Sequence, residues 1–256
     1  MDSSSEQIVG IDSLVVSSAA ALANAQSNAY LGQKPAFWGR YLYAPGQMDS
    51  SGQRDSHYSA AENAFLRSNN IRLMPIARQT THVDRDNATG IADAKRNVDA
   101  IFECVPADYL AGADPRAFVF LDVEGPPSLS AAYYEGWAST IASYSAQLSG
   151  GRAQLLPAIY AGTKDATTWI ALRNAMGNGA ACFGILIYRV YYGSPVPRPW
   201  DDNLVTPAGG VIPPILAWQY WQCPDDAHPD LNFDTSLACP AHSDALMDGL
   251  IMPPPR

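Results

Sequence analysis

Lysine is scarce in this chain of 256 residues, where it occurs only at Lys34, Lys95 and Lys164. The formal net charge is −9, and no cluster of basic residues is visible. Proteins that bind nucleic acid or anionic membranes neutralise phosphate groups with clustered Lys and Arg. The composition therefore argues against both kinds of partner and favours a neutral or weakly charged ligand.

Long apolar runs and the common metal and nucleophile motifs are also missing. No stretch of about 18 uninterrupted apolar residues exists, so we predict no membrane span. The chain contains no CxxC, HExxH or GxSxG motif, which argues against a zinc site and against a serine hydrolase. We therefore expect neither a metal nor a cofactor.

The cysteines leave two alternatives open. Cys223 and Cys239 flank a polar loop that a disulfide would close, whereas Cys104 and Cys182 each lie in apolar surroundings. Buried thiols explain the same sequence equally well.

The segment 14–25 has the apolar character of a signal peptide, but the charges before it are Asp2, Glu6 and Asp12. A signal peptide begins with a positively charged region. We therefore expect this segment to be part of the fold, with no export signal visible in this chain.

Short apolar runs rich in β-branched and aromatic residues alternate with helical patterns along the chain. Most runs are apolar nearly throughout, which is typical of strands buried on both faces of a parallel sheet. The expected strands are residues 8–12, 37–41, 71–77, 117–122, 155–160, 183–188, 215–220 and 231–234. The expected helices are residues 17–30, 58–69, 91–104, 131–148, 164–176 and 244–250.

Strands and helices that alternate in this way match a (β/α)8 TIM barrel. The alternative is an open doubly wound sheet, which usually has a Gly-rich phosphate loop after its first strand, and residues 13–21 contain no glycine. We therefore predict an α/β protein with a single TIM-barrel domain over residues 1–256 and a core at 8–250. The Pro- and Gly-rich segment 193–214 is too long for a simple connector, so it either covers a site or forms a surface excursion.

Active sites of such barrels lie at the carboxyl ends of the strands. The strongest signal at a predicted strand end is the pair Asp122-x-Glu124, which follows the apolar run AFVFL. Residues two apart on a strand face the same side, so we expect both carboxylates in one cleft. Two adjacent acids resist ionising together, which produces the protonated acid and the ionised partner that glycoside hydrolysis requires. A structural ion pair with Arg40 or Arg78 is the alternative.

Other polar and aromatic residues end the remaining predicted strands. Asp12 is either a catalytic group or the N-cap of the next helix, and Asp234 is either a catalytic group or a turn residue. Flat, partly polar aromatic rings suit stacking against sugars, although packing in the core explains many of them equally well. The candidate substrate-binding residues at these strand ends are Arg40, Tyr41, Tyr160, Tyr188 and Trp218.

A series of short motifs runs along the chain in a fixed order. The motifs are GID at 10–12, FWGRYL at 37–42, FLDVEG at 120–125, IYAG at 159–162 and AWQYWQ at 217–222, followed by Asp234. Their order and spacing resemble a bacterial glycoside-hydrolase-like TIM-barrel domain of unknown function, which is related to the family-25 lysozymes. The resemblance covers roughly residues 8–250.

This resemblance implies roles for individual residues. It implies Glu124 as the general acid and Asp122 as its partner carboxylate, with Asp12 and Asp234 as further acids of the site and Trp218 and Gln219 as contacts at the seventh strand. It also implies cleavage of the β-1,4 linkage of peptidoglycan and an extracellular or cell-envelope location. The long segment 193–214 and the lack of cell-wall-binding repeats depart from those lysozymes and leave the identity of the polysaccharide open.

Three functions fit these observations. The leading hypothesis is a glycoside hydrolase that acts on a bacterial cell-wall or related polysaccharide. The second is a carbohydrate-binding barrel that does not turn its ligand over. The third is a metal-dependent phosphodiesterase with the acids as oxygen ligands, but no His or Lys falls at a predicted strand end to support phosphate chemistry. The glycan, the stereochemistry and the oligomeric state stay open.

Overall fold

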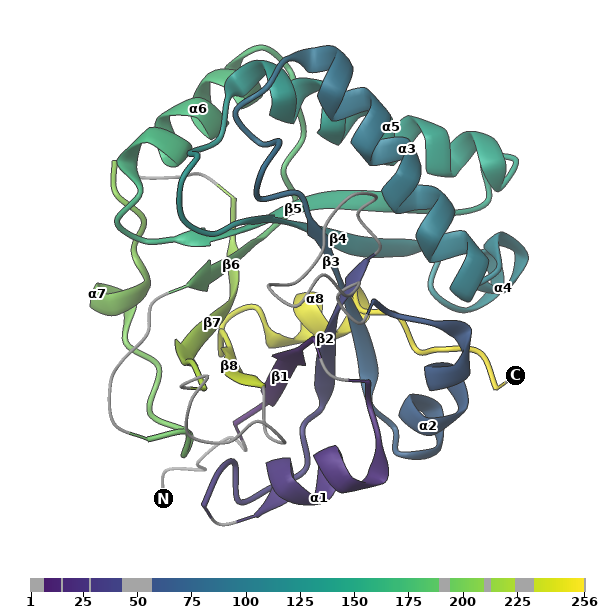
Figure 1. Ribbon diagram of the computed structural model, residues 1–256, viewed down its shortest axis with the longest axis vertical. Coiled ribbons are helices and arrows are strands. Elements are labelled where there is room, and N and C mark those ends of the chain that lie inside the picture. The colour runs from purple at the N-terminus through teal and green to yellow at the C-terminus, as the bar shows by residue number, and fades with distance from the viewer. Residues whose placement is uncertain are drawn as a thin grey trace.

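The computed structural model describes residues 7–14, 16–27, 29–42, 57–188, 194–209, 213–223 and 233–255. Within these ranges the strands β1 to β8 form one closed barrel in the order of the sequence, and helices surround it (Figure 1). The predicted α/β barrel is confirmed. No helix in the described ranges combines the length and the apolar character needed to cross a membrane.

The strands lie close to their predicted positions, with one exception. They are β1 (Val9–Ser13), β2 (Phe37–Leu42), β3 (Arg72–Arg78), β4 (Arg116–Val123), β5 (Gln154–Gly162), β6 (Ile185–Tyr188), β7 (Ile215–Trp221) and β8 (Asp234–Ala238). The exception is β8, which begins at Asp234, whereas the sequence placed its last residue there.

The direction of the last strand also differs from that of a regular (β/α)8 barrel. Successive strands from β1 to β7 are parallel, but β8 is antiparallel to both β7 and β1. The start of β8 therefore lies at the same barrel end as the carboxyl ends of the other strands. We call this end the mouth.

The helices occupy the outer layer, except for the last one. They are α1 (Ala19–Gln26), α2 (Asn63–Ser68), α3 (Asn87–Cys104), α4 (Ala107–Ala113), α5 (Ala131–Leu148), α6 (Ala166–Gly177), α7 (Asp202–Val205) and α8 (Ser243–Asp248), with a 3-10 turn η1 (Ala60–Glu62) before α2. The short helices α4 and α7 were not predicted, while α5 has the predicted bounds, with Ser130 as its N-cap.

Helices α3 and α5 pack very closely. A Cβ at Gly90 would lie 2.2 Å from the carbonyl oxygen of Tyr133, and one at Gly136 would lie 2.2 Å from that of Asn87. Glycine at both positions is what allows the two helix backbones to approach.

Side chains alternate between two cores along each strand. On β2, Phe37 and Tyr41 belong to the core inside the barrel, while Trp38 and Leu42 belong to the core between barrel and helices. Helix α8 closes the end of the barrel opposite the mouth: its Leu246 packs in the inner core. The carboxylates that face the barrel interior lie at the other end, at the mouth.

The described part of the segment 193–214 packs against the outer surface of β7. Tyr220 Oη donates to the carbonyl oxygen of Pro195 at 2.7 Å, and the Trp200 ring meets the Trp218 ring edge-on with centroids 6.2 Å apart. This part of the segment is a surface excursion; residues 193 and 210–212 lie outside the described ranges.

Cys223 and Cys239, both in the described part of the chain, are not joined by a disulfide. Cys223 follows β7, and its backbone N–H bonds to Asp234 at the mouth. Cys239 follows β8, and its backbone N–H bonds to Leu216 at the start of β7. Because the two strands are antiparallel, the two cysteines lie at opposite ends of the barrel.

Candidate functional site

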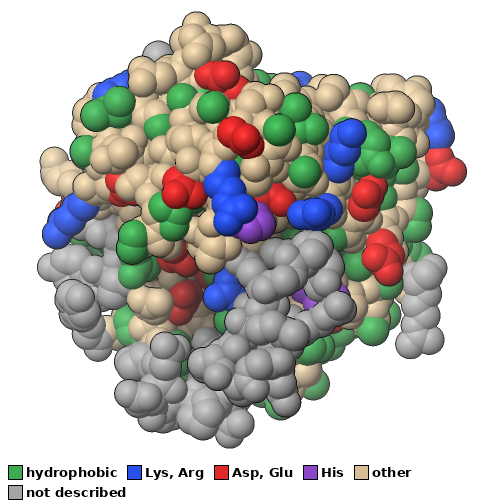
Figure 2. All heavy atoms as spheres, turned by 45° about the horizontal axis from the view of Figure 1, so that its top comes forward, with side chains coloured by type: hydrophobic (Ala, Val, Ile, Leu, Met, Phe, Trp, Pro, Cys, Tyr) green, Lys and Arg blue, Asp and Glu red, His purple; other side chains and the backbone are tan. Residues whose placement is uncertain are grey.

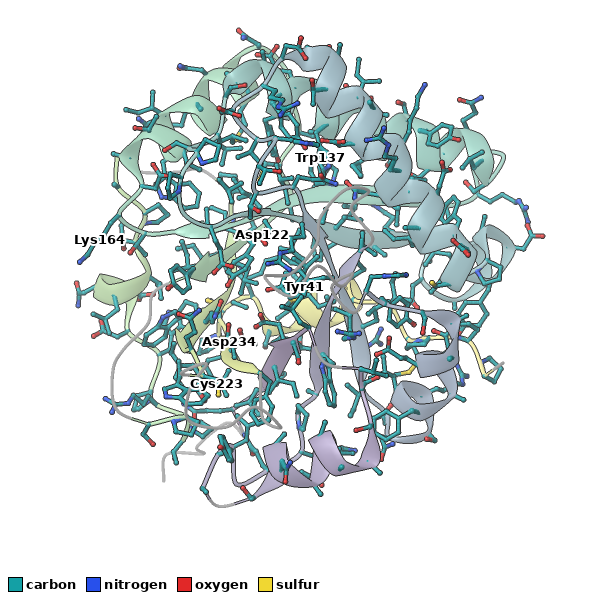
Figure 3. The ribbon with its side chains drawn as sticks, in the orientation of Figure 1. Tyr41, Asp122, Trp137, Lys164, Cys223 and Asp234 are labelled. Carbon is teal, nitrogen blue, oxygen red and sulfur yellow. The ribbon has the colours of Figure 1, made fainter. Side chains whose placement is uncertain are left out.

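The mouth of the barrel contains a pocket of about 370 Å³, which falls in the range of about 300–1,000 Å³ that is usual for ligand sites. Its lining is mostly polar and comprises Asp12, Ser13, Leu14, Tyr41, Arg78, Thr80, Thr81, Asp122, Glu124, Pro126, Gln222, Cys223 and Asp234. Figure 3 shows Tyr41, Asp122 and Asp234 over the middle of the barrel, whereas Trp137 lies in the outer helical layer and Lys164 at the periphery. Acidic and basic side chains lie together in a hollow on the face seen in Figure 2.

Asp12 faces the pocket from β1 and is 1% exposed. Its register partner on β2 is Gly39, where a Cβ would lie 2.5 Å from the Cβ of Asp12, so glycine at 39 leaves room for this side chain. Tyr41 Oη donates to Oδ2 of Asp12 at 3.5 Å, but Oδ1 has no hydrogen-bond partner among the described residues.

Burial raises the pKa of Asp12 well above its ordinary value of 3.8, and repulsion from the three other carboxylates of the pocket raises it further. The N-cap of α1 is Ser18, so the alternative that Asp12 caps this helix does not hold. A buried carboxylate without full hydrogen bonding is costly, which makes Asp12 a candidate for contact with a ligand.

Asp122 and Glu124 stand at the end of β4 and face the same pocket, as their spacing predicted. Burial raises the pKa of Asp122 well above its ordinary value, and the nearby Glu124 raises it further; Arg78 and the backbone N–H of Glu124 act in the opposite direction. Burial also raises the pKa of Glu124, opposed first by the hydrogen bond with Tyr160 and then by Arg78. Two acids in one site of low dielectric do not ionise independently, so the titrations of Asp122 and Glu124 are coupled.

Two further predicted residues, Tyr160 and Gln219, lie beneath these acids and are fully buried. Tyr160 Oη lies 2.6 Å from Oε1 of Glu124 and also forms a hydrogen bond with Oε1 of Gln219. The side-chain amide of Gln219 donates to Oδ2 of Asp234 at 2.7 Å, and the backbone N–H of Cys223 donates to Oδ1 of Asp234 at 2.9 Å. Tyr160 therefore contacts the Glu124 carboxylate and the Gln219 amide and does not line the pocket.

Tyr41 and Tyr188 lie near the opening. Tyr41 lines the pocket, and the Arg78 guanidinium lies 5.6 Å from the centre of its ring. Tyr188 Oη donates to Oε1 of Gln222, a pocket residue, at 3.1 Å, and its ring meets the Tyr160 ring edge-on.

Five predicted site residues do not line the pocket: Tyr160, Gln219 and Tyr188, described above, and Arg40 and Trp218, which lie on the outer side of the barrel wall. Arg40 is fully buried and forms an ion pair with Glu62, with Nε 2.8 Å from Oε2. Trp218 belongs to the outer core against Trp200. Each is the chain neighbour of an inward-facing residue, and neighbours on a strand face opposite sides.

Sequence reasoning missed part of the pocket. The sequence analysis named Arg78 only as a structural ion-pair partner, and it did not name Thr80, Thr81 or Gln222 as site residues. Arg78 is two residues after the inward-facing Ile76, so strand alternation was the signal that could have found it. The threonines and Gln222 follow their strands, where no such periodicity applies.

No group of three or more His, Cys, Asp or Glu side chains within the described ranges is arranged to hold a metal ion.

No protein-family model matches the chain, and the comparison with curated proteins found no match. Solved structures do share its fold. An uncharacterized protein of B. stearothermophilus has 19% identity and a TM-score of 0.63, with 95% of this chain and 100% of that chain covered. The catalytic domain of endolysin ply40 from bacteriophage P40 of Listeria monocytogenes has 16% identity and a TM-score of 0.53, with 96% and 99% covered.

A third structure is the Tat-secreted protein Rv2525c of Mycobacterium tuberculosis, in complex with L-tartrate. It has 14% identity and a TM-score of 0.54, with 91% of this chain and 96% of that chain covered. At these identities the likeness shows a common barrel fold.

Proposed function

We propose that this chain is a glycoside hydrolase that acts on a bacterial cell-wall or related polysaccharide by carboxylate acid catalysis. The observation that carries the proposal is the pair Asp122 and Glu124 at the end of β4. Both face one pocket, and burial raises the pKa of each. A protonated acid beside an ionised carboxylate is the arrangement that cleavage of a glycosidic bond requires.

In the proposed reaction Glu124 gives its proton to the glycosidic oxygen. The bond between this oxygen and the anomeric carbon breaks, and the leaving sugar departs as an alcohol. The carboxylate of Asp122 stabilises the positive charge that develops on the anomeric carbon, or attacks that carbon as a nucleophile. Water then adds to the anomeric carbon and returns one proton to Glu124, so that the net reaction consumes one water molecule.

The remaining pocket residues bind the sugar. Asp12 and Asp234 orient the substrate or the attacking water, and Tyr41 and Tyr188 contact the sugar near the opening. The pocket volume of about 370 Å³ and its many hydroxyl, amide and carboxylate groups suit a compact, polar, uncharged ligand such as a sugar unit.

The comparisons support the choice of polysaccharide and location. The endolysin domain that shares this barrel is the catalytic domain of a phage enzyme, and another protein with the fold is Tat-secreted. By analogy we propose a cell-wall glycan as substrate and an extracellular or cell-envelope site of action; fold analogy alone does not define a substrate.

Release of soluble reducing sugar tests this proposal. The panel consists of purified peptidoglycan, chitin oligomers, arabinogalactan and β-glucans. Each is incubated with the wild-type protein, with Glu124→Gln and with Glu103→Gln, which changes an exposed carboxylate on α3. General acid catalysis typically contributes about 10²–10⁴ in rate, so we expect Glu124→Gln to lose that factor and Glu103→Gln to keep full activity.

Two outcomes would overturn the proposal. Full activity in Glu124→Gln would remove Glu124 from the acid role. Binding of a glycan by calorimetry without release of sugar from any substrate would establish a carbohydrate-binding barrel instead.

A further inference from the structure

A row of hydrogen bonds runs beneath the pocket from β8 to β4. It connects Asp234 on β8, Gln219 on β7, Tyr160 on β5 and Glu124, which directly follows β4. Tyr160 and Gln219, the middle members, are fully buried, so bulk water does not compete for their hydrogen bonds. The direction of each hydrogen bond follows from what the groups at the Asp234 end can donate.

Asp234 sets the direction at one end. Its Oδ1 accepts the backbone N–H of Cys223 at 2.9 Å, and its Oδ2 accepts the side chain of Gln219 at 2.7 Å. Both donors are N–H groups, which can only donate, so Asp234 accepts on both oxygens.

An acceptor at Asp234 orients the amide of Gln219. The NH₂ group faces Asp234, because the opposite orientation would bring two oxygens together without a proton between them. The carbonyl oxygen Oε1 then faces Tyr160. Among the described residues, Tyr160 Oη is the hydrogen-bond partner of this oxygen.

Tyr160 has a single hydroxyl proton, and a carbonyl oxygen can only accept. The proton of Tyr160 is therefore directed at Gln219, and its oxygen is left to accept from Glu124, which lies 2.6 Å away. We propose that Asp234, acting through Gln219 and Tyr160, holds the acid proton on Glu124. The proposal rests on the hydrolase function above and makes Asp234, Gln219 and Tyr160 positioning residues for its general acid.

The charged and titratable groups around Glu124 act in both directions. Asp12, Tyr41, Arg78, Asp122 and Asp234 line the same pocket as Glu124. Burial raises the pKa of Glu124, whereas Arg78 lowers it, and so would a hydrogen bond that Tyr160 donates to its carboxylate. Burial and repulsion from Glu124 raise the pKa of Asp122, and the backbone N–H of Glu124 lowers it. The direction of the hydrogen bond between Tyr160 and Glu124 therefore affects how firmly Glu124 holds its proton.

The test is the sign of a pKa change. The side-chain carboxyl of Glu124 is titrated by ¹³C NMR in glutamate-labelled protein, with its signal assigned by its absence from Glu124→Gln. If Tyr160 accepts the proton of Glu124, Tyr160→Phe removes a partner of the protonated form. We expect the pKa of Glu124 to fall by about one pH unit, a tenfold weaker hold on the proton. Tyr144→Phe, on the outer helix α5, is the control and should leave this pKa unchanged.

The opposite assignment gives the opposite sign. If Tyr160 donates to an ionised Glu124, Tyr160→Phe raises the pKa of Glu124. A rise or no change would overturn the proposal.

A second variant tests the middle of the row and does not depend on the first. Gln219→Met removes the acceptor of the Tyr160 proton, so this proton turns toward Glu124 and favours the ionised form. We expect the pKa of Glu124 to fall here as well, and an unchanged value would overturn the role of Gln219.

These pKa measurements need no substrate, so their outcome does not depend on whether the protein is a hydrolase. If Glu124→Gln keeps full hydrolytic activity, the hydrolase role fails while the NMR titration still reports the row. In an active enzyme, Tyr160→Phe should move the alkaline limb of the kcat profile to lower pH. A purely structural defect would lower kcat equally at every pH.

Discussion

Two groups of buried charges lie on opposite sides of the same barrel wall, and they differ in how completely they are paired. On the outer side, Arg40 pairs with Glu62, whose two oxygens also accept the backbone N–H and hydroxyl of Ser17 and the backbone N–H of Ser59. On the inner side, Asp12 and Asp122 each keep one oxygen without a partner among the described residues.

Burial alone therefore does not separate structure from function here, because Arg40 and Asp122 are both at most 1% exposed. Complete hydrogen bonding marks the outer pair as part of the fold. Buried carboxylates that lie close together without complete hydrogen bonding lower the stability of the fold. Such an arrangement is typical of sites that bind a ligand. Chain neighbours such as Arg40 and Tyr41 belong to different groups because they face opposite sides of β2.

The largest effect on stability is expected in the outer group. Glu62→Gln leaves the buried Arg40 without a counter-charge, and breaking one partner of a buried ion pair typically costs about 3–5 kcal/mol. Urea denaturation would measure this loss, with Glu103→Gln as the control at an exposed carboxylate. A loss below about 1 kcal/mol would show that the outer pair is not the structural contact described here.

The inner group should respond in the opposite direction. Asp12→Asn removes a carboxyl group whose ionisation is opposed by burial and by the neighbouring carboxylates, so we expect the variant to be more stable at pH 7 by about 0.5–2 kcal/mol, while hydrolysis falls. Thermal unfolding compared with Asp248→Asn, which changes an exposed residue of α8, provides the measurement. If Asp12→Asn is less stable than Asp248→Asn, the interpretation that the buried Asp12 carboxyl lowers the stability of the folded protein is wrong.

The pH dependence of this difference follows from the raised pKa of Asp12. The folded state holds the proton more tightly than the unfolded state, so the contribution of this group to stability is full below about pH 3.8 and is lost as pH rises toward the raised pKa. The advantage of Asp12→Asn over wild type should therefore grow as pH rises from 4 to neutral. Denaturation series at several pH values would reveal a constant difference if the prediction is wrong.

The smallest effect on ligand binding is expected at Trp218. Because this ring lies in the outer core against Trp200, Trp218→Phe should leave glycan affinity unchanged while lowering stability by about 1–2 kcal/mol. Tyr41→Phe, on the pocket side, should weaken binding several-fold. Calorimetry with the preferred glycan would compare the affinities of the two variants. Weaker binding by Trp218→Phe would show that Trp218 contributes to the glycan site.

Much of the fold was predictable because it depends on local patterns. Apolar runs placed every strand to within a few residues except β8, whose polar sequence DTSLA carries little signal. The helices α4 and α7 were missed because 7 and 4 residues are too few to show a helical period. At the candidate site, the spacing of Asp122 and Glu124 correctly predicted a shared face, since alternation is a property of the strand itself. The same rule applied to Trp218 and Gln219 would have separated them.

Hydrophobic periodicity and strand alternation act over a few residues, so the amino-acid sequence was enough to predict an α/β barrel with a pair of acids at the end of its fourth strand. The partners of those acids depend on contacts between distant segments. Arg40 and Glu62 are 22 residues apart and meet where η1 packs on the outer wall, and Tyr160 and Gln219 are 59 apart and meet because the barrel closes. The reversal of β8 is equally non-local, and it is what brings Asp234 to the mouth. The burial that raises the pKa of Asp12, Asp122 and Glu124 arises from the same closure, because desolvation depends on the whole surrounding wall.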